Sequence, residues 1–348
     1  MFVRLKLNVV LIFGAKSKGQ GSMDKRLKLR CFFIKMYDII NLKYLKGFDI
    51  MNVLLKIPAY ILMVVSLSGF LSGEMIKCVY SRRKADCDKG VYVYTFWVSL
   101  ICAVFIWVIS GFVVYISLYT AIMAIAFGIS VMGQIAASAF AMKLGPWSYT
   151  AVMMSLSTVI PALSGVLLWN EQLTLSKVIG IVLMLVCFVL SVKTDDDDSK
   201  KRKTNIKWFL LSLTASICTG GIGILQKMHQ TSVYRNEIFG FLIVSFLCSA
   251  VLSLILVWLT GTAVKKVLLA NMSVLPFLVL AGIGAAFNHI INLYLSGAME
   301  SAVFFPVMSG GELVFVTAAS IAVFKERLSS KQWAGLICGI FATVILCM

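Results

Sequence analysis

Between Ile57 and Met348 the chain is a succession of apolar runs separated by short polar breaks. A run of about 20 apolar residues is the length that an α-helix needs to cross the hydrocarbon core of a bilayer. The runs lack the alternation of polar and apolar residues that marks the strands of a membrane barrel. Because the chain is 60% hydrophobic and 14% charged, its apolar surface exceeds what one soluble core can bury. We therefore expect an all-α integral membrane protein in contact with membrane lipid.

Ten candidate membrane-spanning helices follow one another in this part of the chain. Their boundaries, good to several residues, are 57–79, 91–111, 118–142, 146–168, 174–192, 208–229, 237–260, 273–297, 301–323 and 330–348.

The second half of the chain repeats the first. A shift of 155 residues aligns residues 126–191 with residues 281–346. The aligned identities include Ala126 with Ala281, Ile135 with Ile290, Glu171 with Glu326, and Gly180 with Gly335. Because each half holds an odd number of spans, the second copy enters the membrane from the opposite side, which makes the repeats inverted. Such repeats build carriers with a midplane cavity between them.

The repeat defines the expected domains. The first five-helix repeat covers residues 57–193, a charged linker covers residues 194–207, and the second repeat covers residues 208–348. Residues 1–50 are basic, and their lysines and arginines interrupt every apolar stretch. We expect this segment to be disordered, or to result from a start codon placed too early, with Met51 as the true first residue.

The net charge of +17 does not indicate a nucleic-acid partner. Of 32 basic residues, 11 lie in the first 50 positions and nearly all the others lie between spans, as membrane orientation requires. The nine cysteines are scattered and none lies close in sequence to a histidine, so we expect neither a metal nor a cofactor. The expected location is a bacterial cell membrane.

Both repeats carry one short motif where the fourth span of the repeat ends. The motif is Glu-x-Leu with a glycine nine residues after the glutamate: Glu171, Leu173 and Gly180 in the first copy, Glu326, Leu328 and Gly335 in the second. Over residues 57–348 this pattern resembles the drug/metabolite transporter superfamily in its ten-helix EamA form. The resemblance implies a secondary transporter of small metabolites, amino acids, related compounds or drugs, commonly an exporter. Relatives are usually drawn with both termini in the cytoplasm, whereas the basic loops of this chain favour termini outside.

Glu171 and Glu326 occupy equivalent positions, so we expect them to serve the shared scaffold. Each is followed three residues later by a hydroxyl, Thr174 or Ser329, that can cap the next helix. A glutamate close to the free amides of that next helix would be stabilised by the helix dipole and would fix a tight hairpin.

Glu312 differs because its counterpart in the first repeat is Ser157. It lies about ten residues into the ninth span, where an ionised carboxylate costs at least roughly 2.5–3.5 kcal/mol. Pro306, Gly310 and Gly311 weaken the helix before it, and Pro161 lies in the corresponding fourth span, so paired interruptions are expected at the binding site. We expect Glu312 to carry a coupling proton or to pair with a cationic solute; the alternative is a protonated carboxyl that bonds a neighbouring helix.

Further polar residues lie in the apolar spans. Asn288 and Asn292 share one face of the eighth span, His289 lies beside them, and Gln134 matches His289 at the repeat offset. We expect these four residues to bind solute, although interhelical bonding would explain them equally well. Glu74 and Gln226 close the first and sixth spans and are candidates for the same site.

Lys77 and Lys227 lie beside Glu74 and Gln226, and we expect both to extend to the membrane interface.

A secondary transporter of a small-molecule solute, coupled to a proton or another ion, is the leading hypothesis. We do not expect an enzyme, because the two histidines lie on different spans without a nucleophile or metal motif. No phosphate-binding loop is present either, so gradients are the simplest energy source. A membrane-embedded enzyme and a channel or non-transporting sensor are the alternatives.

Overall fold

The computed structural model describes residues 57–83, 89–112, 114–145, 147, 150, 153–154, 156–172, 174–191, 206–259, 274–325 and 330–346. These residues are almost entirely helical, as expected. The helical elements are α3 (Ala59–Arg83), α4 (Lys89–Ile109), α5 (Leu118–Leu144), η3 (Leu156–Thr158), α7 (Val159–Trp169), α8 (Leu175–Ser191), α9 (Ile206–Gln230), α10 (Ile238–Leu259), α12 (Leu275–Ala298), α13 (Ser301–Phe324) and α14 (Ser330–Leu346).

Seven helices in the described part are long and apolar enough to cross a membrane: α3, α4, α5, α9, α10, α12 and α13. The helical fold is therefore confirmed, and the length and composition of these seven helices suit a multi-pass membrane protein. Among the described residues, three shorter α-helices accompany them, namely α7 with 11 residues and α8 and α14 with 17 residues each.

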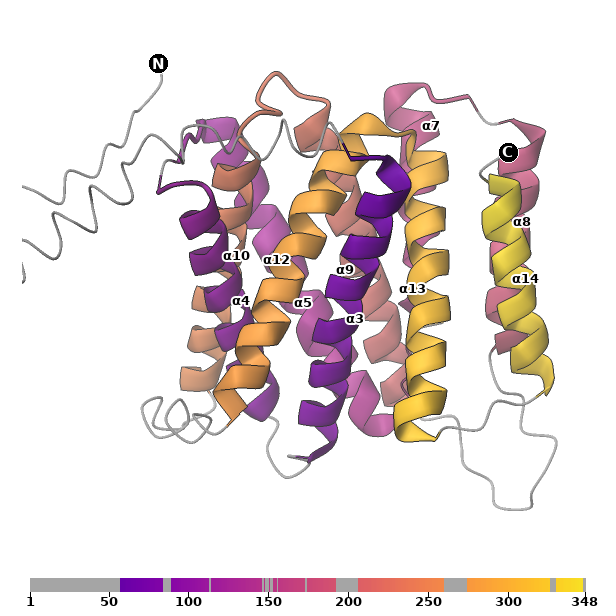
Figure 1. The fold of residues 1–348 in the computed structure, drawn as a ribbon, viewed down its shortest axis with the longest axis horizontal. Helices are drawn as coiled ribbons and strands as arrows, with labels where there is room; N and C mark the ends of the chain where they lie inside the picture. Colours follow the sequence, from indigo (N-terminus) through magenta and orange to yellow (C-terminus); the bar gives the residue numbers. More distant parts are fainter. Residues whose placement is uncertain are drawn as a thin grey trace, which may run out of the picture.

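Most of the close helix pairs join the two halves of the sequence. Helix α3 packs on α12, α5 on α9, α4 on α10, and α8 on α14 (Figure 1). The pair α8 and α14 lies side by side at one edge of the bundle. The main hydrophobic core likewise takes aromatic side chains from both halves, including Phe127 of α5, Phe241 and Phe246 of α10 and Phe304 of α13.

Two helices end in the same unusual way. Asn170 ends α7 and Lys325 ends α13, and both adopt the left-handed conformation, with φ of 52° and 53°. The two residues are separated by the repeat offset of 155. Their cap N–H groups bond the carbonyls of Gly165 and Ser320, which are separated by the same offset. A left-handed residue of this kind is a common way to satisfy the last carbonyls of a helix.

The fourth span is interrupted, but the ninth is not. The 3-10 turn η3 precedes α7, and Pro161 lies in the first turn of α7. In contrast, α13 continues as one helix through Pro306, Gly310 and Gly311. The expectation of paired interruptions was therefore wrong for the second copy. Pro306 is the sixth residue of α13, so only one helical turn precedes it and has to adjust to the proline ring.

Helices α3 and α12 approach each other closely because both present glycine at the crossing. A Cβ atom added to Gly69 would lie 2.6 Å from the backbone oxygen of Gly284. Gly73, one turn further along α3, is less crowded, since its added Cβ would lie 3.8 Å from the oxygen of Ala281.

This difference gives a matched pair of variants. Gly69→Ala should lower the free energy of unfolding by about 1–3 kcal/mol, because the added methyl group forces the two backbones apart. Gly73→Ala should change it much less. Thermal unfolding of the two purified variants in one detergent measures the difference, and equal midpoints would contradict the close α3–α12 approach.

Candidate functional site

A cavity of about 170 Å³ lies between the two halves of the chain. Helices α3, α4 and α5 line it from the first half, together with η3 and α7, and helices α9, α12 and α13 line it from the second. All seven residues expected at a binding or coupling site line this one cavity: Glu74, Gln134, Gln226, Asn288, His289, Asn292 and Glu312. The structure thus brings the candidates together, and their roles stay predictions.

Glu312 lies at the middle of α13 and faces this cavity. Within the described part of the chain, no hydrogen bond or ion pair joins its carboxyl group to another residue. The charged groups that act on it electrostatically are Glu74 and Lys77 of α3. Its repeat counterpart Ser157 also lines the cavity. A carboxyl group without a fixed partner is suited to bind a proton or a cation.

Glu74 and Lys77 form a buried ion pair at the cavity wall. The Lys77 Nζ lies 2.5 Å from the Glu74 Oε1 and donates a 2.9 Å hydrogen bond to Ser138 Oγ of α5. Lys77 is 2% exposed and Glu74 is 8% exposed. The expectation that Lys77 extends to the membrane interface was therefore wrong. Residues three apart on a helix are neighbours, so the glutamate holds the amine inside.

Two glutamine side chains also line the cavity. Gln134 of α5 and Gln226 of α9 form no hydrogen bond with other residues in the described part of the chain. Gln226 is nevertheless only 4% exposed. Gln134 is half-buried, and both amides are available to hydrogen-bond a solute or water in the cavity.

Asn288 and Asn292 are linked to α3 through Ser66, a residue not singled out in the sequence. Asn288 Nδ2 donates to the carbonyl oxygen of Ser66 at 3.2 Å and to Ser66 Oγ at 3.0 Å. Ser66 Oγ in turn donates to Asn292 Oδ1 at 2.7 Å. Interhelical bonding, one of the two interpretations of the sequence, thus accounts for these contacts. A lone serine in an apolar span gave no signal for this role.

The Ser66 contacts predict an effect on stability rather than on transport. Ser66→Ala removes the hydroxyl that serves both amides, so we expect a loss of about 0.6–2 kcal/mol, the range measured for hydrogen bonds between membrane helices. Thermal unfolding checks this, with exposed Ser68→Ala as the control. Normal stability combined with lost transport would instead assign Asn288 and Asn292 to the solute.

His289 lies against aromatic rings rather than polar groups. Its ring centroid is 5.0 Å from that of Phe246 and 5.9 Å from that of Phe127, in edge-to-face geometry. Its Nδ1 atom is buried and has no hydrogen-bond partner in the described residues. His289 borders the cavity while its ring is held by the apolar core.

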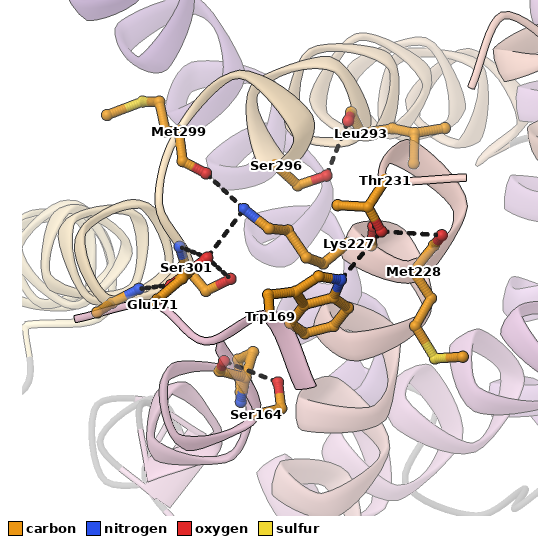
Figure 2. A network of polar contacts seen from close by, with 12 residues as sticks. Ser164, Trp169, Glu171, Lys227, Met228, Thr231, Leu293, Ser296, Met299 and Ser301 are labelled. Carbon is orange, nitrogen blue, oxygen red and sulfur yellow. Dashed lines mark hydrogen bonds and ion pairs between the residues drawn. The ribbon is translucent and has the colours of Figure 1, made fainter. Parts of the chain in front are cut away.

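Glu171 lies outside the cavity and joins the two halves at one end of the bundle (Figure 2). Its Oε1 accepts hydrogen bonds from the backbone N–H and the hydroxyl of Ser301, both at 3.1 Å, and its Oε2 accepts from the Ala302 N–H at 3.3 Å. The Lys227 Nζ lies 3.1 Å from Oε1 and donates to the carbonyl of Met299 at 2.7 Å. We call Glu171, Lys227, Met299, Ser301 and Ala302 the end network.

The end network corrects two expectations. Glu171 caps the start of α13 and not the next helix α8, because the α7–α8 loop places its carboxylate against the free amides of α13. Lys227 does not extend to the membrane interface, since its side chain is only 8% exposed and is bonded within the network. Glu326, expected to play the equivalent role, lies outside the described residues.

The end network also sets the ionisation of Glu171. Burial of the carboxyl disfavours its charged form, but the Ser301 N–H and hydroxyl together with Lys227 outweigh this effect. The pKa of Glu171 is therefore held below its usual value. Gln226 and Phe304 lie within one turn of the network on α9 and α13, and both line the cavity, so the network lies just beyond one end of it.

Fold and site together define a helical protein with several helices that could cross a membrane and a mostly apolar cavity between its halves, into whose wall a few polar and charged side chains are set. The chain is 31% identical over 196 residues to an uncharacterized protein of Haemophilus influenzae. The matched region is 56% of this chain and 63% of that protein, so less than two thirds of the relative is covered. A solved crystal structure of a protein without a stated function is similar in fold, with a TM-score of 0.56 and 11% identity over 82% of this chain and 96% of the other. No family model matches the sequence.

Proposed function

We propose that this protein is a secondary transporter that moves a small solute across the membrane by alternating access, as a member of the drug/metabolite transporter superfamily of the EamA type. The observation that carries the proposal is the cavity between the two halves. Its wall holds Glu312, Gln134 and Gln226, three polar side chains without protein hydrogen bonds in the described part of the chain. Polar side chains that only held helices together would bond to neighbouring helices, whereas side chains that bind a transported polar solute must be free to hydrogen-bond it.

The proposed architecture is ten spans in two inverted five-helix repeats. The offset of 155 makes α3, α4, α5, α7 and α8 the counterparts of α9, α10, α12, α13 and α14. The closest helix pairs of the described residues map onto one another when counterparts are exchanged. The pair α3 with α12 becomes α9 with α5, and α5 with α10 becomes α12 with α4. The pairs α4 with α10, α7 with α13, and α8 with α14 map onto themselves. This exchange supports a twofold axis between the repeats.

Contacts at the helix ends support the inversion itself. Glu171, which follows α7, bonds the first residues of α13, so α7 ends where its counterpart begins. Thr120, near the start of α5, contacts His229 at the end of α9, and Lys227 of α9 bonds Met299 at the end of α12. Helix α5 thus begins at the end of the bundle where its counterpart α12 finishes. The equal left-handed caps of α7 and α13 support the same alignment.

The experiment has two stages. Comparative metabolomics of cells with and without the protein identifies compounds whose internal level changes, and these compounds are then tested in proteoliposomes. We expect saturable uptake that is accelerated by the same compound inside the vesicle. A non-saturable flux with single-channel conductance would indicate a channel, and conversion of the compound to a new product would indicate an enzyme.

A further inference from the structure

Three charged side chains line the cavity: Glu74 and Lys77 of α3 and Glu312 of α13. His289 of α12 and Tyr94 of α4 are the other titratable side chains in its wall, within the described part of the chain. Tyr94 donates its hydroxyl proton to the Gly73 carbonyl at 3.0 Å, and the His289 ring lies against Phe127 and Phe246. The fixed charges of the cavity are therefore two carboxylates and one ammonium group.

The ammonium group of Lys77 neutralises the carboxylate of Glu74, and the carboxylate of Glu312 has no counterion among the described residues. The Lys77 Nζ lies 2.5 Å from Glu74 Oε1 and donates to Ser138 Oγ, so its contacts within the described residues are to α3 and α5 and not to Glu312. Glu312 has no ion-pair partner in the described residues. Because an ionised carboxylate without a counterion is destabilised inside a protein, the cavity as a whole requires one additional positive charge when Glu312 is ionised.

We propose that Lys77 determines the charge of the transported solute, by limiting the cavity to one positive charge at a time, either a proton or the cationic group of an organic monocation. The inference rests on the proposed function, since it assigns a solute class to the same cavity. When the monocation arrives, Glu312 releases its proton to water and its carboxylate pairs with the cation. One proton leaves for each cation bound, and the net charge of the cavity does not change.

The remaining wall of the cavity fits such a solute. Five aromatic side chains line it: Phe70, Tyr94, Trp147, Phe304 and Phe305. Aromatic faces attract organic cations and cover apolar groups. Gln134 and Gln226 add amides that can donate or accept hydrogen bonds. The expected solute is thus a small monocation with an apolar or aromatic part.

The charge balance predicts that one variant loses cation binding and that a second substitution restores it. An ion pair with only a structural role would not give this pattern. In Glu74→Gln, Lys77 becomes the counterion of Glu312, so the side chains of the cavity have no net negative charge. This variant should bind cations poorly although Glu312 is intact. In the double variant Glu74→Gln/Lys77→Met one negative charge is again in excess, and binding should return. In Lys77→Met alone two negative charges are in excess, and a dication should be preferred.

The test uses the full chain in detergent, with benzylammonium as the monocation and p-xylylenediammonium as the dication. Titration calorimetry in two buffers of different ionisation enthalpy gives both the affinity and the number of protons released. We expect the unchanged protein to prefer the monocation by about tenfold or more and to release about one proton per cation bound. Glu74→Gln should bind benzylammonium at least about tenfold more weakly, and the double variant should recover most of that loss.

Three results would overturn the inference: no benzylammonium binding by the unchanged protein, unaltered binding by Glu74→Gln, or a double variant as weak as Glu74→Gln although thermal unfolding shows both to be folded. The comparison between Glu74→Gln and the double variant does not require Lys77→Met alone to fold, although that variant leaves two carboxylates unpaired. Failure of the proposed function gives a different pattern. Binding with the predicted loss and rescue, but without exchange in proteoliposomes, would retain the one-charge cavity and exclude a transporter.

Discussion

Glu312→Gln should abolish the accumulation of solute driven by a pH gradient while the protein remains folded. The amide keeps the size of the side chain but can neither release a proton nor balance a cation, so the imposed gradient no longer drives net movement. In proteoliposomes with an acidic compartment on one side, accumulation should fall by roughly tenfold or more, to the level of passive equilibration. No pH dependence of the residual uptake should remain.

A matched control lies at the start of the same helix. Glu300→Gln makes the same chemical change at an exposed position that precedes α13 and does not line the cavity, so accumulation should be retained. An unchanged pH profile in Glu312→Gln would show that this carboxyl only packs helices. Passive exchange by the same variant gives a further distinction. Exchange should persist in this variant if Glu312 only carries the proton. It should be lost if the carboxylate also pairs with a cationic solute, which is the outcome expected for a cavity that holds one positive charge at a time.

Breaking the end network should cause the largest loss of stability. The side chains of Glu171 and Lys227 are 9% and 8% exposed, so either single replacement leaves a buried charge without its partner. We expect Glu171→Gln and Lys227→Met each to lower the free energy of unfolding by on the order of 3 kcal/mol. The double variant should recover part of this loss, because it leaves no unpaired ion. Substrate affinity of the surviving protein should change less than stability does.

Thermal unfolding of the four proteins in detergent gives the coupling between the two sites. Arg235→Met is the matched control for Lys227→Met, because it removes an exposed charge near the end of the same helix. Full stability with abolished transport in Glu171→Gln would contradict the scaffold role and would assign the network to the transport cycle itself.

The network also predicts a pH dependence. The pKa of Glu171 is held below the unfolded value of 4.5, so its stabilising contribution is complete above that pH and is lost as the pH falls through the lower folded pKa. Acidification through this range should therefore destabilise the unchanged protein more than Glu171→Gln. Parallel melting curves of the two proteins at decreasing pH provide the measurement.

The helices and the composition of the cavity could be predicted from the sequence because both depend on solvation. Most described helices begin and end close to a predicted boundary, since the hydrocarbon core excludes polar residues from about 20 positions at a time. Helix α7 is the exception, because it begins at Val159 after the turn η3, whereas the fourth span was predicted from residue 146. The seven cavity residues were conspicuous for the same reason. A glutamate or an amide in an apolar span is costly and must face a partner or a cavity.

The partners of these residues could not be predicted, because they depend on packing between distant segments. Ser66 meets Asn288 across 222 positions of sequence, and Glu171 meets Ser301 across 130. The equivalent positions of Glu171 and Glu326 indicated a scaffold role. The closeness of Glu171 to α8 in sequence suggested a contact with that helix, whereas its carboxylate bonds the start of α13 instead. The Glu74–Lys77 contact is different. Its three-residue spacing is visible in the sequence, and the preference of lysine for the interface was given too much weight.

The pairing of α3 with α12 has a consequence for biosynthesis. Ser66 of α3 meets Asn288 only after more than 220 further residues have been synthesised and α12 has entered the membrane. Glu171 likewise meets Ser301 only after α13 has begun to enter. The first five helices are thus inserted with polar groups that their own half does not satisfy. We therefore expect the insertion machinery or a membrane chaperone to keep these polar groups out of contact with lipid while the chain is still bound to the ribosome. If the gene is split at the linker, the two fragments should be degraded when produced separately and should survive when produced together.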